Sequence, residues 1–147
     1  MSGHFAALDG ADFPPFEPGT VWLVGAGPGA PGLLSLLGYY ALGQADIVVY
    51  DALVAPSVLN FANSKAERVP AGKRGGKPSP KQADISLSLI EWARDGKRVL
   101  RLKGGDPFMF GRGGEEAAAL WRAGIKFRIV PGISSGLGGL AYAGIPV

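Results

Sequence analysis

The stretch KRVLRLKGGDPFMFGRGGEEAAALWRAG, residues 97–124, decides the fold class. Its first part, 97–102, is a short run with a residue pattern typical of a β-strand. Its last part, 113–124, has acids in the first turn and a terminal glycine, as helices do. A glycine-rich loop joins the two parts. The unit therefore predicts a strand that leads through a tight loop into a helix.

The same unit recurs along the chain. We expect strands over 20–25, 46–51, 67–72, 97–102 and 126–132, and helices over 33–45, 55–62, 80–96, 113–124 and 134–144. Strands that alternate with helices form parallel sheets with right-handed crossovers. The sequence therefore predicts an α/β fold: a five-stranded, mainly parallel sheet with helices on both faces.

Glycines and one acid mark the ends of these strands. Glycine makes up 24 of the 147 residues, more than twice its average share of about 7%. The glycines cluster at 25–32, 72–76, 104–114 and 132–144, and Asp51 also follows a strand. Ligands of parallel sheets bind beyond the carboxyl ends of the strands. We therefore expect these residues to share one cleft.

Composition excludes several kinds of chemistry. The chain has no cysteine, so disulfides, thiolate metal sites and cysteine nucleophiles are absent, which fits a reducing cytosol and a cytoplasmic location. Its single histidine, His4, lies in a proline-rich segment, 1–19, that we expect to be a disordered leader. A histidine-based triad or zinc site is therefore not expected, and acid–base chemistry falls to Asp, Glu, Lys or Tyr.

Charge is distributed unevenly. Residues 1–72 hold two Lys/Arg and six Asp/Glu, whereas residues 73–147 hold thirteen and six, which gives −4 and +7. A basic second half favours an anionic partner, either nucleic acid or a small polycarboxylate or phosphate. The aromatic-interleaved pattern of an RNA-binding sheet is missing, so we expect no nucleic acid. No apolar run is long enough to cross a membrane, so we expect no membrane partner.

The first glycine motif permits a dinucleotide. The stretch VGAGPGAPGLL, residues 24–34, satisfies the relaxed G-x-G-x-x-G/A fingerprint after a strand. Asp51 ends the second strand, where a ribose-binding acid would stand. Pro28 and Pro31 count against this interpretation, because each removes an N–H that a pyrophosphate would need.

The second glycine motif points to a nucleoside without a pyrophosphate. Gly104 and Gly105 let a ligand lie against the main chain, and Asp106 offers two acceptors to a ribose diol. The apolar run 108–110 suits a flat ring or a thioether. A dinucleotide enzyme would not need this second loop, so adenosine joined to something other than phosphate is favoured.

Several blocks together resemble the N-terminal domain of the uroporphyrinogen-III C-methyltransferases, within the tetrapyrrole methylase family. They cover most of the chain from about residue 20 to 147, in order and at family spacing. The blocks are VGAGPG, ADIVVYDALV, GKRGGKPSPKQADIS, KRVLRLKGGDPFMFGRGGEE and FRIVPGISSGLGGLAYAGIPV.

The resemblance implies an activity and a set of site residues. The methyl donor would be S-adenosyl-L-methionine, with S-adenosyl-L-homocysteine as product. The acceptor would be uroporphyrinogen III, methylated at C2 and C7 to precorrin-2 for sirohaem and cobalamin. Asp51 corresponds to the family's proposed proton acceptor and Lys73 to its proposed proton donor. The positions that correspond to donor contacts are Pro28, Gly104, Gly105, Asp106, Met109, Ser134 and Ser135.

The resemblance also implies how the domain is organised. Residues 20–147 would form the N-terminal methylase domain. The family's second α/β domain, which follows GIPV and helps to enclose the donor, is absent from the 147 residues. Full-length members of the family form homodimers. The family usually has Asp and Thr where this chain has Ala30 and Ser35.

Two alternatives stay open from the residues alone. A nicotinamide enzyme would use Asp51 to hold a ribose, whereas the methylase interpretation assigns the ribose to Asp106. A catalytically silent domain, kept for binding or dimerisation, would fit Ala30 and the missing second domain.

Overall fold

The structure, a computed structural model, describes residues 8, 11–71 and 82–147. The strands are β1 (Val21–Gly25), β2 (Ile47–Tyr50), β3 (Glu67–Pro70), β4 (Val99–Lys103) and β5 (Phe127–Val130). The helices are the short 3-10 helix η2 (Pro31–Leu33), α1 (Leu36–Gln44), α2 (Pro56–Leu59), α3 (Gln82–Arg94), α4 (Gly113–Arg122) and α5 (Ser135–Tyr142).

The five strands form one parallel sheet in the order β3-β2-β4-β1-β5. The glycine end of β1 lies beside the end of β4, because Gly25 is in register with Lys103. The predicted fold class, a parallel five-stranded α/β sheet with helices on both faces, is confirmed. The parallel order brings the carboxyl ends of all five strands to one edge, as the sequence predicts.

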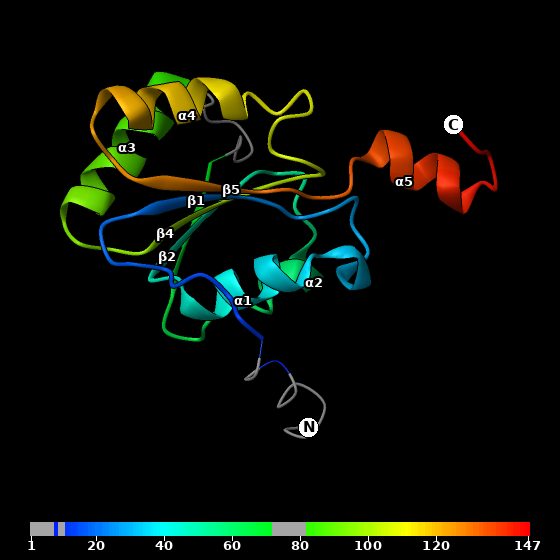
Figure 1. Ribbon diagram of the computed structural model, residues 1–147, viewed down its shortest axis with the longest axis horizontal. Helices are drawn as coiled ribbons and strands as arrows, with labels where there is room; N and C mark the ends of the chain where they lie inside the picture. The colour runs from blue at the N-terminus through cyan, green and yellow to red at the C-terminus, as the bar shows by residue number, and fades with distance from the viewer. Residues whose placement is uncertain (1–7, 9–10, 72–81) are drawn as a thin grey trace.

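Helices cover both faces of the sheet (Figure 1): α1 and α2 lie on one face, α3 and α4 on the other. Alternate residues of each strand therefore enter different cores. In β4, Leu100 and Leu102 join the core beneath α1 and α2, whereas Val99 joins the core beneath α3 and α4. Because both faces are buried, any charged side chain in a central strand needs a partner inside the protein.

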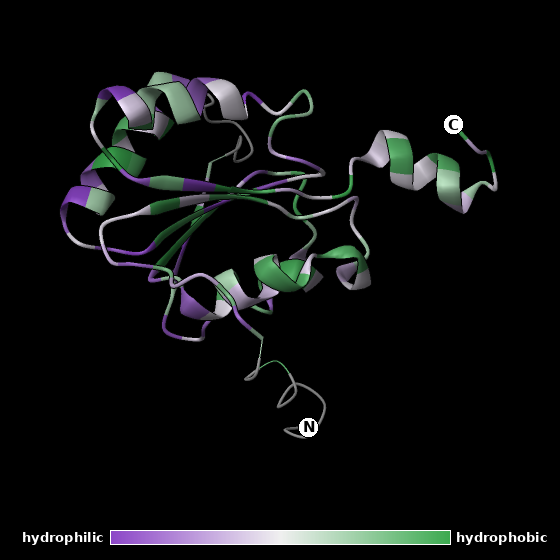
Figure 2. Cartoon of the chain, viewed as in Figure 1, coloured by the Kyte–Doolittle hydropathy of each residue, from purple (hydrophilic) through white to green (hydrophobic). Residues whose placement is uncertain are grey.

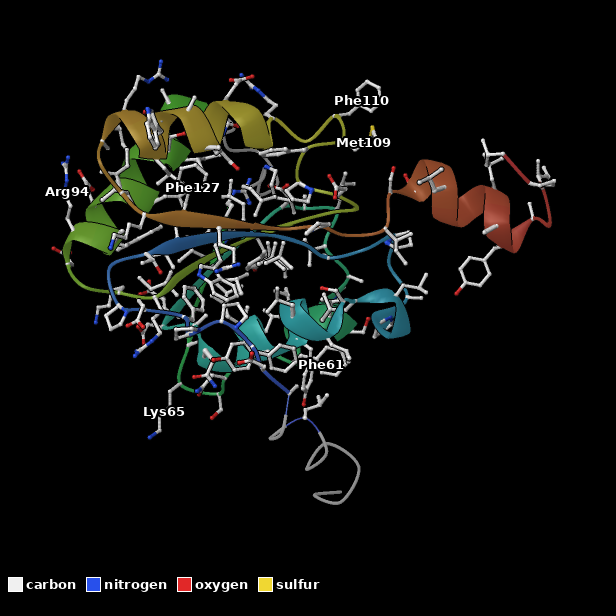
Figure 3. The ribbon with its side chains drawn as sticks, in the orientation of Figure 1. Phe61, Lys65, Arg94, Met109, Phe110 and Phe127 are labelled. Carbon is white, nitrogen blue, oxygen red and sulfur yellow. The ribbon has the colours of Figure 1, made fainter. Side chains whose placement is uncertain are left out.

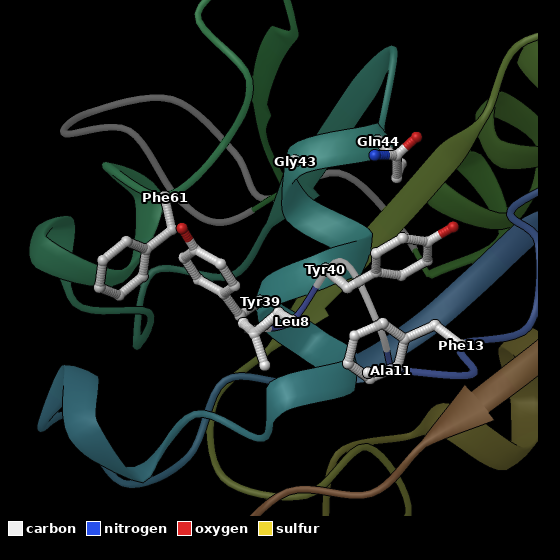
Figure 4. Close-up of a pocket in the computed structure, with 8 residues that line it drawn as sticks. All are labelled: Leu8, Ala11, Phe13, Tyr39, Tyr40, Gly43, Gln44 and Phe61. Atoms are coloured by element: carbon white, nitrogen blue, oxygen red, sulfur yellow. The ribbon is translucent and has the colours of Figure 1, made fainter. Parts of the chain in front are cut away.

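The segment before β1 packs against the domain. Phe16 is buried and stacks on Trp22, with ring centroids 4.5 Å apart. Phe13 stacks on Tyr40 of α1 at 4.9 Å, beside a small aromatic pocket (Figure 4). The expectation of a disordered leader is therefore corrected over residues 11–19, because their aromatic side chains bury apolar surface. Residues 1–7 and 9–10 lie outside the described residues.

The first helix begins later than the sequence predicts. Over 31–33 the chain forms η2, and α1 starts at Leu36, after Ser35, whose hydroxyl accepts a hydrogen bond from the Gly38 N–H at 3.0 Å. Serine is a preferred residue at this capping position. The hydroxyl that Ser35 retains therefore has a structural role in this chain. Ala30, which precedes η2, provides no side-chain cap.

The last helix stands apart from the rest. In Figure 1, α5 projects beyond the carboxyl edge of the sheet. Only Gly138 of this helix is buried, whereas Leu137 and Tyr142 are exposed. Figure 2 shows α5 mostly in white and green, the colours of intermediate and hydrophobic residues. In the described part of the chain, no helix is both long and apolar enough to cross a bilayer.

Candidate functional site

Two glycine loops are joined at the carboxyl edge of the sheet. The Gly27 N–H donates to the Gly105 carbonyl oxygen at 3.1 Å, and the Gly105 N–H donates to the Gly27 carbonyl oxygen at 2.8 Å. The two residues thus form an antiparallel bridge between the loops after β1 and β4. Gly27 has φ +76° and Gly105 has φ +64°, values that glycine adopts without strain.

A third loop closes on the same point. A Cβ added to Gly25 would lie 2.6 Å from the Gly105 oxygen, and one added to Gly132 would lie 2.2 Å from it. Three backbones therefore meet with no room for a side chain. The glycines expected to bring a ligand against the main chain serve first to pack the loops after β1, β4 and β5 together.

A single cleft lies above this junction. Asp51 lines it, as do all seven residues expected to contact the methyl donor: Pro28, Gly104, Gly105, Asp106, Met109, Ser134 and Ser135. These residues come from four separate segments of the chain, and the sheet brings them together. Lys73 and the basic positions Arg74, Lys77 and Lys81 lie outside the described residues.

Asp106 holds the cleft's central loop in place. Its Oδ1 accepts a hydrogen bond from the Phe108 N–H at 2.8 Å, and its Oδ2 accepts one from the Gly132 N–H at 3.0 Å. An ionised carboxylate has about four acceptor positions, so two remain for hydroxyl groups of a ligand. The side chain is half-buried and lines the cleft. Asp106 therefore suits a ribose diol and also ties the β4 loop to the β5 loop, a role that the sequence did not reveal.

The rim of the cleft is apolar and exposed. Met109 is 52% exposed and Phe110 is fully exposed, and Figure 3 shows both at the tip of the loop between β4 and α4. Leu53 and Leu137 add exposed apolar surface to the same cleft. This rim offers contacts to a thioether or an aromatic ring, as expected for Met109. It also remains uncovered by the described part of the chain.

The start of α5 forms another side of the cleft. Ser134 is its N-cap, and the Ser134 hydroxyl oxygen accepts a hydrogen bond from the Gly136 N–H at 3.3 Å. Ser135 is the first residue of the helix and is exposed. Ser134 therefore caps α5, and both serines lie beside the Gly105 loop.

A network of buried charges lies at the floor of the cleft. The Arg101 guanidinium donates through Nη2 to Asp51 Oδ1 at 2.5 Å and through Nε to Glu116 Oε1 at 2.9 Å. Lys103 Nζ lies 3.8 Å from Asp51 Oδ2 and 3.2 Å from Glu116 Oε2. Asp51 is 31% exposed, whereas Arg101, Lys103 and Glu116 are almost completely buried. The two cations and two anions balance in charge.

Sequence reasoning missed this network. It counted all the Lys and Arg residues of the basic second half toward an anionic partner, but Arg101 and Lys103 are paired inside the protein. A signal was present, because residues two apart in a strand share a face and this face is covered by α3 and α4. Two cations on a buried face require acids nearby, and Glu116 follows in the first turn of the next helix.

The dinucleotide alternative is not supported by this geometry. It requires the Asp51 carboxylate to accept from a ribose diol. In the structure that carboxylate receives Arg101 at one oxygen and faces Lys103 at the other. Both carboxylates keep free acceptor positions, but Asp51 is paired with cations, whereas Asp106 accepts from backbone N–H groups.

One ion pair at the cleft margin is exposed. Arg112 Nε and Nη2 donate to the two oxygens of Glu115 at 3.0 and 2.8 Å. The hydrogen bond from Arg112 lowers the pKa of the Glu115 carboxyl, and the same bond raises the pKa of Arg112. Among residues 8, 11–71 and 82–147, no group of three His, Cys, Asp or Glu side chains could hold a metal ion.

Comparison with known families agrees with the fold. Residues 20–147 match the model of the tetrapyrrole (corrin/porphyrin) methylases. The chain therefore belongs to the tetrapyrrole methylase family, and the resemblance inferred from its sequence is confirmed.

Curated relatives include a uroporphyrinogen-III C-methyltransferase from a Sinorhizobium species. It is 66% identical over 137 residues, which cover 93% of this chain and 49% of the relative. A sirohaem synthase from Zymomonas mobilis is 56% identical over 129 residues, which cover 88% of this chain and 27% of the relative. The chain thus spans half or less of the length of these relatives.

Solved structures agree. A crystal structure of uroporphyrin-III C-methyltransferase from Thermus thermophilus matches with TM-score 0.77 and 50% identity, over 86% of this chain and 53% of that chain. A crystal structure of a uroporphyrin-III C-methyltransferase from Thermus thermophilus complexed with S-adenosylhomocysteine matches with TM-score 0.73 and 46% identity, over 86% of this chain and 52% of that chain.

Proposed function

We propose that this chain supplies the donor-binding cleft and the catalytic base of a uroporphyrinogen-III C-methyltransferase. In this proposal S-adenosyl-L-methionine is the methyl donor, and uroporphyrinogen III is methylated at C2 and C7 to give precorrin-2. The names of the relatives support the substrate, and the S-adenosylhomocysteine complex of the Thermus thermophilus enzyme supports the donor. The lack of cysteine supports a cytoplasmic location for the protein.

The observation that carries the proposal is the convergence of the expected residues. Asp51 and the seven expected donor contacts line one cleft, although they come from segments far apart in the sequence. The cleft combines bare glycine backbone, a carboxylate with spare acceptors and an apolar rim. These features suit an adenosyl thioether. The bare backbone lets the ligand lie close, the carboxylate can bind its ribose, and the apolar rim can contact its thioether.

The residues fit the chemistry. S-adenosylmethionine, when bound, provides an electrophilic methyl group: the S–CH3 bond breaks while a pyrrole carbon forms the new C–CH3 bond with its own electron pair. The protein mainly orients the two partners. The macrocycle then loses a proton, and Asp51, partly exposed in the cleft, is placed to accept it. Lys73 is the proposed donor of a proton.

Basic residues and exposed apolar side chains support further parts of the proposal. The acceptor carries eight carboxylates, and the basic positions Lys73, Arg74, Lys77 and Lys81 would receive some of them. The exposed rim of Leu53, Phe110 and Leu137 would pack against the second domain that the family carries. Homodimer formation is likewise proposed for the full-length protein.

Turnover of the natural full-length protein tests the proposal. Incubation with S-adenosylmethionine and uroporphyrinogen III is expected to yield a doubly methylated product, seen as a mass increase of two methyl groups. Asp51→Asn should lower the rate by about 100-fold or more, because a general base is removed. Donor binding without any methylation would favour the alternative of a silent binding domain and would contradict the proposal.

A further inference from the structure

We propose that Glu116 is a positioning residue: it fixes Asp51 in the cleft by holding the cations Arg101 and Lys103 from behind. This inference rests on the proposed function, in which Asp51 accepts a proton from the macrocycle. Glu116 does not line the cleft and is fully buried. It can therefore influence the reaction only through the residues between it and the cleft.

A single guanidinium connects the two acids. Arg101 uses Nε for Glu116 and Nη2 for Asp51. Because the guanidinium is rigid and planar, its orientation at one carboxylate sets its orientation at the other. Its remaining Nη1 is 3.4 Å from the carbonyl oxygens of Val49 and Leu102, which restrains it further. Rotation of Arg101 would thus move the Asp51 carboxylate.

Glu116 is itself firmly placed. It lies in the first turn of α4, where the helix dipole favours a negative charge. Its Oε1 also accepts from Gln82 Nε2 at 2.9 Å, so α3 and α4 both fix it. Its Oε2 has no hydrogen bond in the described structure and faces the Lys103 ammonium at 3.2 Å.

The location of the network argues for a functional role. Buried ion pairs are expensive to desolvate, and apolar residues of similar size often give equal or greater stability. Stability alone therefore does not explain two buried cations and a buried acid in this core. Of the four charged side chains, Asp51 is the most exposed, and its carboxylate lies in the cleft, whose floor Arg101 and Lys103 also line. Such an arrangement keeps the two carboxylate oxygens of Asp51 at a fixed position. A displacement of about 1 Å in a catalytic group can cost about 100-fold in rate.

An exposed glutamate away from the cleft provides a matched control. Glu91 has the same side chain, but it is exposed on α3 and does not line the cleft. The test compares Glu116→Gln with Glu91→Gln in the natural full-length protein. Each variant is characterised by kcat and KM for both substrates, by S-adenosylhomocysteine affinity and by thermal unfolding. Both changes are also made in the Asp51→Asn background.

Glu116→Gln should lower kcat by at least about tenfold, because Arg101 and Lys103 lose the negative charge of Glu116 and no longer hold Asp51 in a fixed position. The KM values and the S-adenosylhomocysteine affinity should stay within about twofold, and Glu91→Gln should match the unmodified protein. In the Asp51→Asn background, Glu116→Gln should cause no further loss beyond about twofold, because residues that act as a unit are not additive.

An equal loss of kcat from Glu116→Gln in both backgrounds would overturn the inference, as would an unchanged kcat in a folded variant. If Glu116→Gln does not fold, the Arg101→Lys variant tests the inference in its place. It keeps the charge but cannot span two carboxylates, so it should reproduce the loss of kcat and its dependence on Asp51. Failure of the unmodified protein to methylate would instead remove the proposed function, and this inference with it.

Discussion

Gly132 approaches Gly105 so closely that a methyl group on its Cα would stand 2.2 Å from the Gly105 carbonyl oxygen. The loops after β4 and β5 therefore touch through their backbones. Asp106 adds a hydrogen bond across the same junction, to the Gly132 N–H. The shape of the cleft thus depends on residues with no side chain.

Gly132→Ala should destabilise the domain by about 1–3 kcal/mol, because the added methyl group forces the two loops apart. S-adenosylhomocysteine affinity should fall together with stability, since the same loops line the cleft. Urea unfolding and isothermal titration measure the two effects. Gly43→Ala is the control: this exposed position in α1 has open space around it, and the change should be neutral or slightly stabilising. Equal stability of the two variants would contradict the packing argument.

Asp106→Ala should both weaken donor binding and loosen the cleft. It removes two hydrogen bonds to backbone N–H groups, each worth about 0.5–1.5 kcal/mol, in addition to the proposed ribose contact. We expect a lower unfolding temperature and at least about a tenfold loss of S-adenosylhomocysteine affinity. Asp106→Asn keeps one oxygen acceptor, so its unfolding temperature and its S-adenosylhomocysteine affinity should lie between those of the unmodified protein and those of Asp106→Ala. Unchanged affinity in Asp106→Ala would exclude a ribose contact at this residue.

Met109→Ala should weaken donor binding without affecting the fold. Met109 is 52% exposed, so its truncation removes little buried surface in the unliganded protein. In the proposed complex it covers the donor, and its loss should reduce S-adenosylhomocysteine affinity by about three- to tenfold. Leu87→Ala removes a comparably exposed side chain from α3 and should change neither property. A loss of stability in Met109→Ala as large as the loss of affinity would contradict this role.

The Arg112–Glu115 pair predicts a specific titration. The hydrogen bond from Arg112 lowers the pKa of the Glu115 carboxyl below its ordinary value of 4.5. Because the pKa is lower in the folded state, any stability from this pair is present above the ordinary pKa and is lost as the pH falls through the lowered value. Carbon-13 NMR titration should show Glu115 titrating below 4.5, and Arg112→Ala should bring its pKa back toward that value. No difference between the two proteins would contradict the pairing.

Much of the fold follows from local pattern. The run that became β1 is apolar and ends in Gly25, and the mainly apolar run that became β4 is followed by Gly104, so strand and loop could be read directly. Boundaries were less predictable: α1 starts after Ser35 because its hydroxyl caps the helix, although apolar spacing begins earlier. The packing of Phe16 on Trp22 depends on contact with the sheet, which a proline-rich segment does not reveal.

The site, too, could be predicted only in part from the sequence. Glycines and acids after strands pointed to a shared cleft, because parallel topology gathers strand ends at one edge. The partners of these residues could not be read from spacing. Asp51 and Arg101 are 50 residues apart, and Gln82 and Glu116 are 34 apart. Such pairs depend on the strand order and on the packing of α3 against α4.

We expect the cleft to bind an adenosyl thioether and not a dinucleotide. Isothermal titration of the natural full-length protein with S-adenosylhomocysteine, with NAD in parallel, distinguishes the two ligands. We predict one binding site for S-adenosylhomocysteine, weakened by Asp106→Ala, and no heat of binding with NAD. Binding of NAD, or no binding of S-adenosylhomocysteine by the folded protein, would contradict the account.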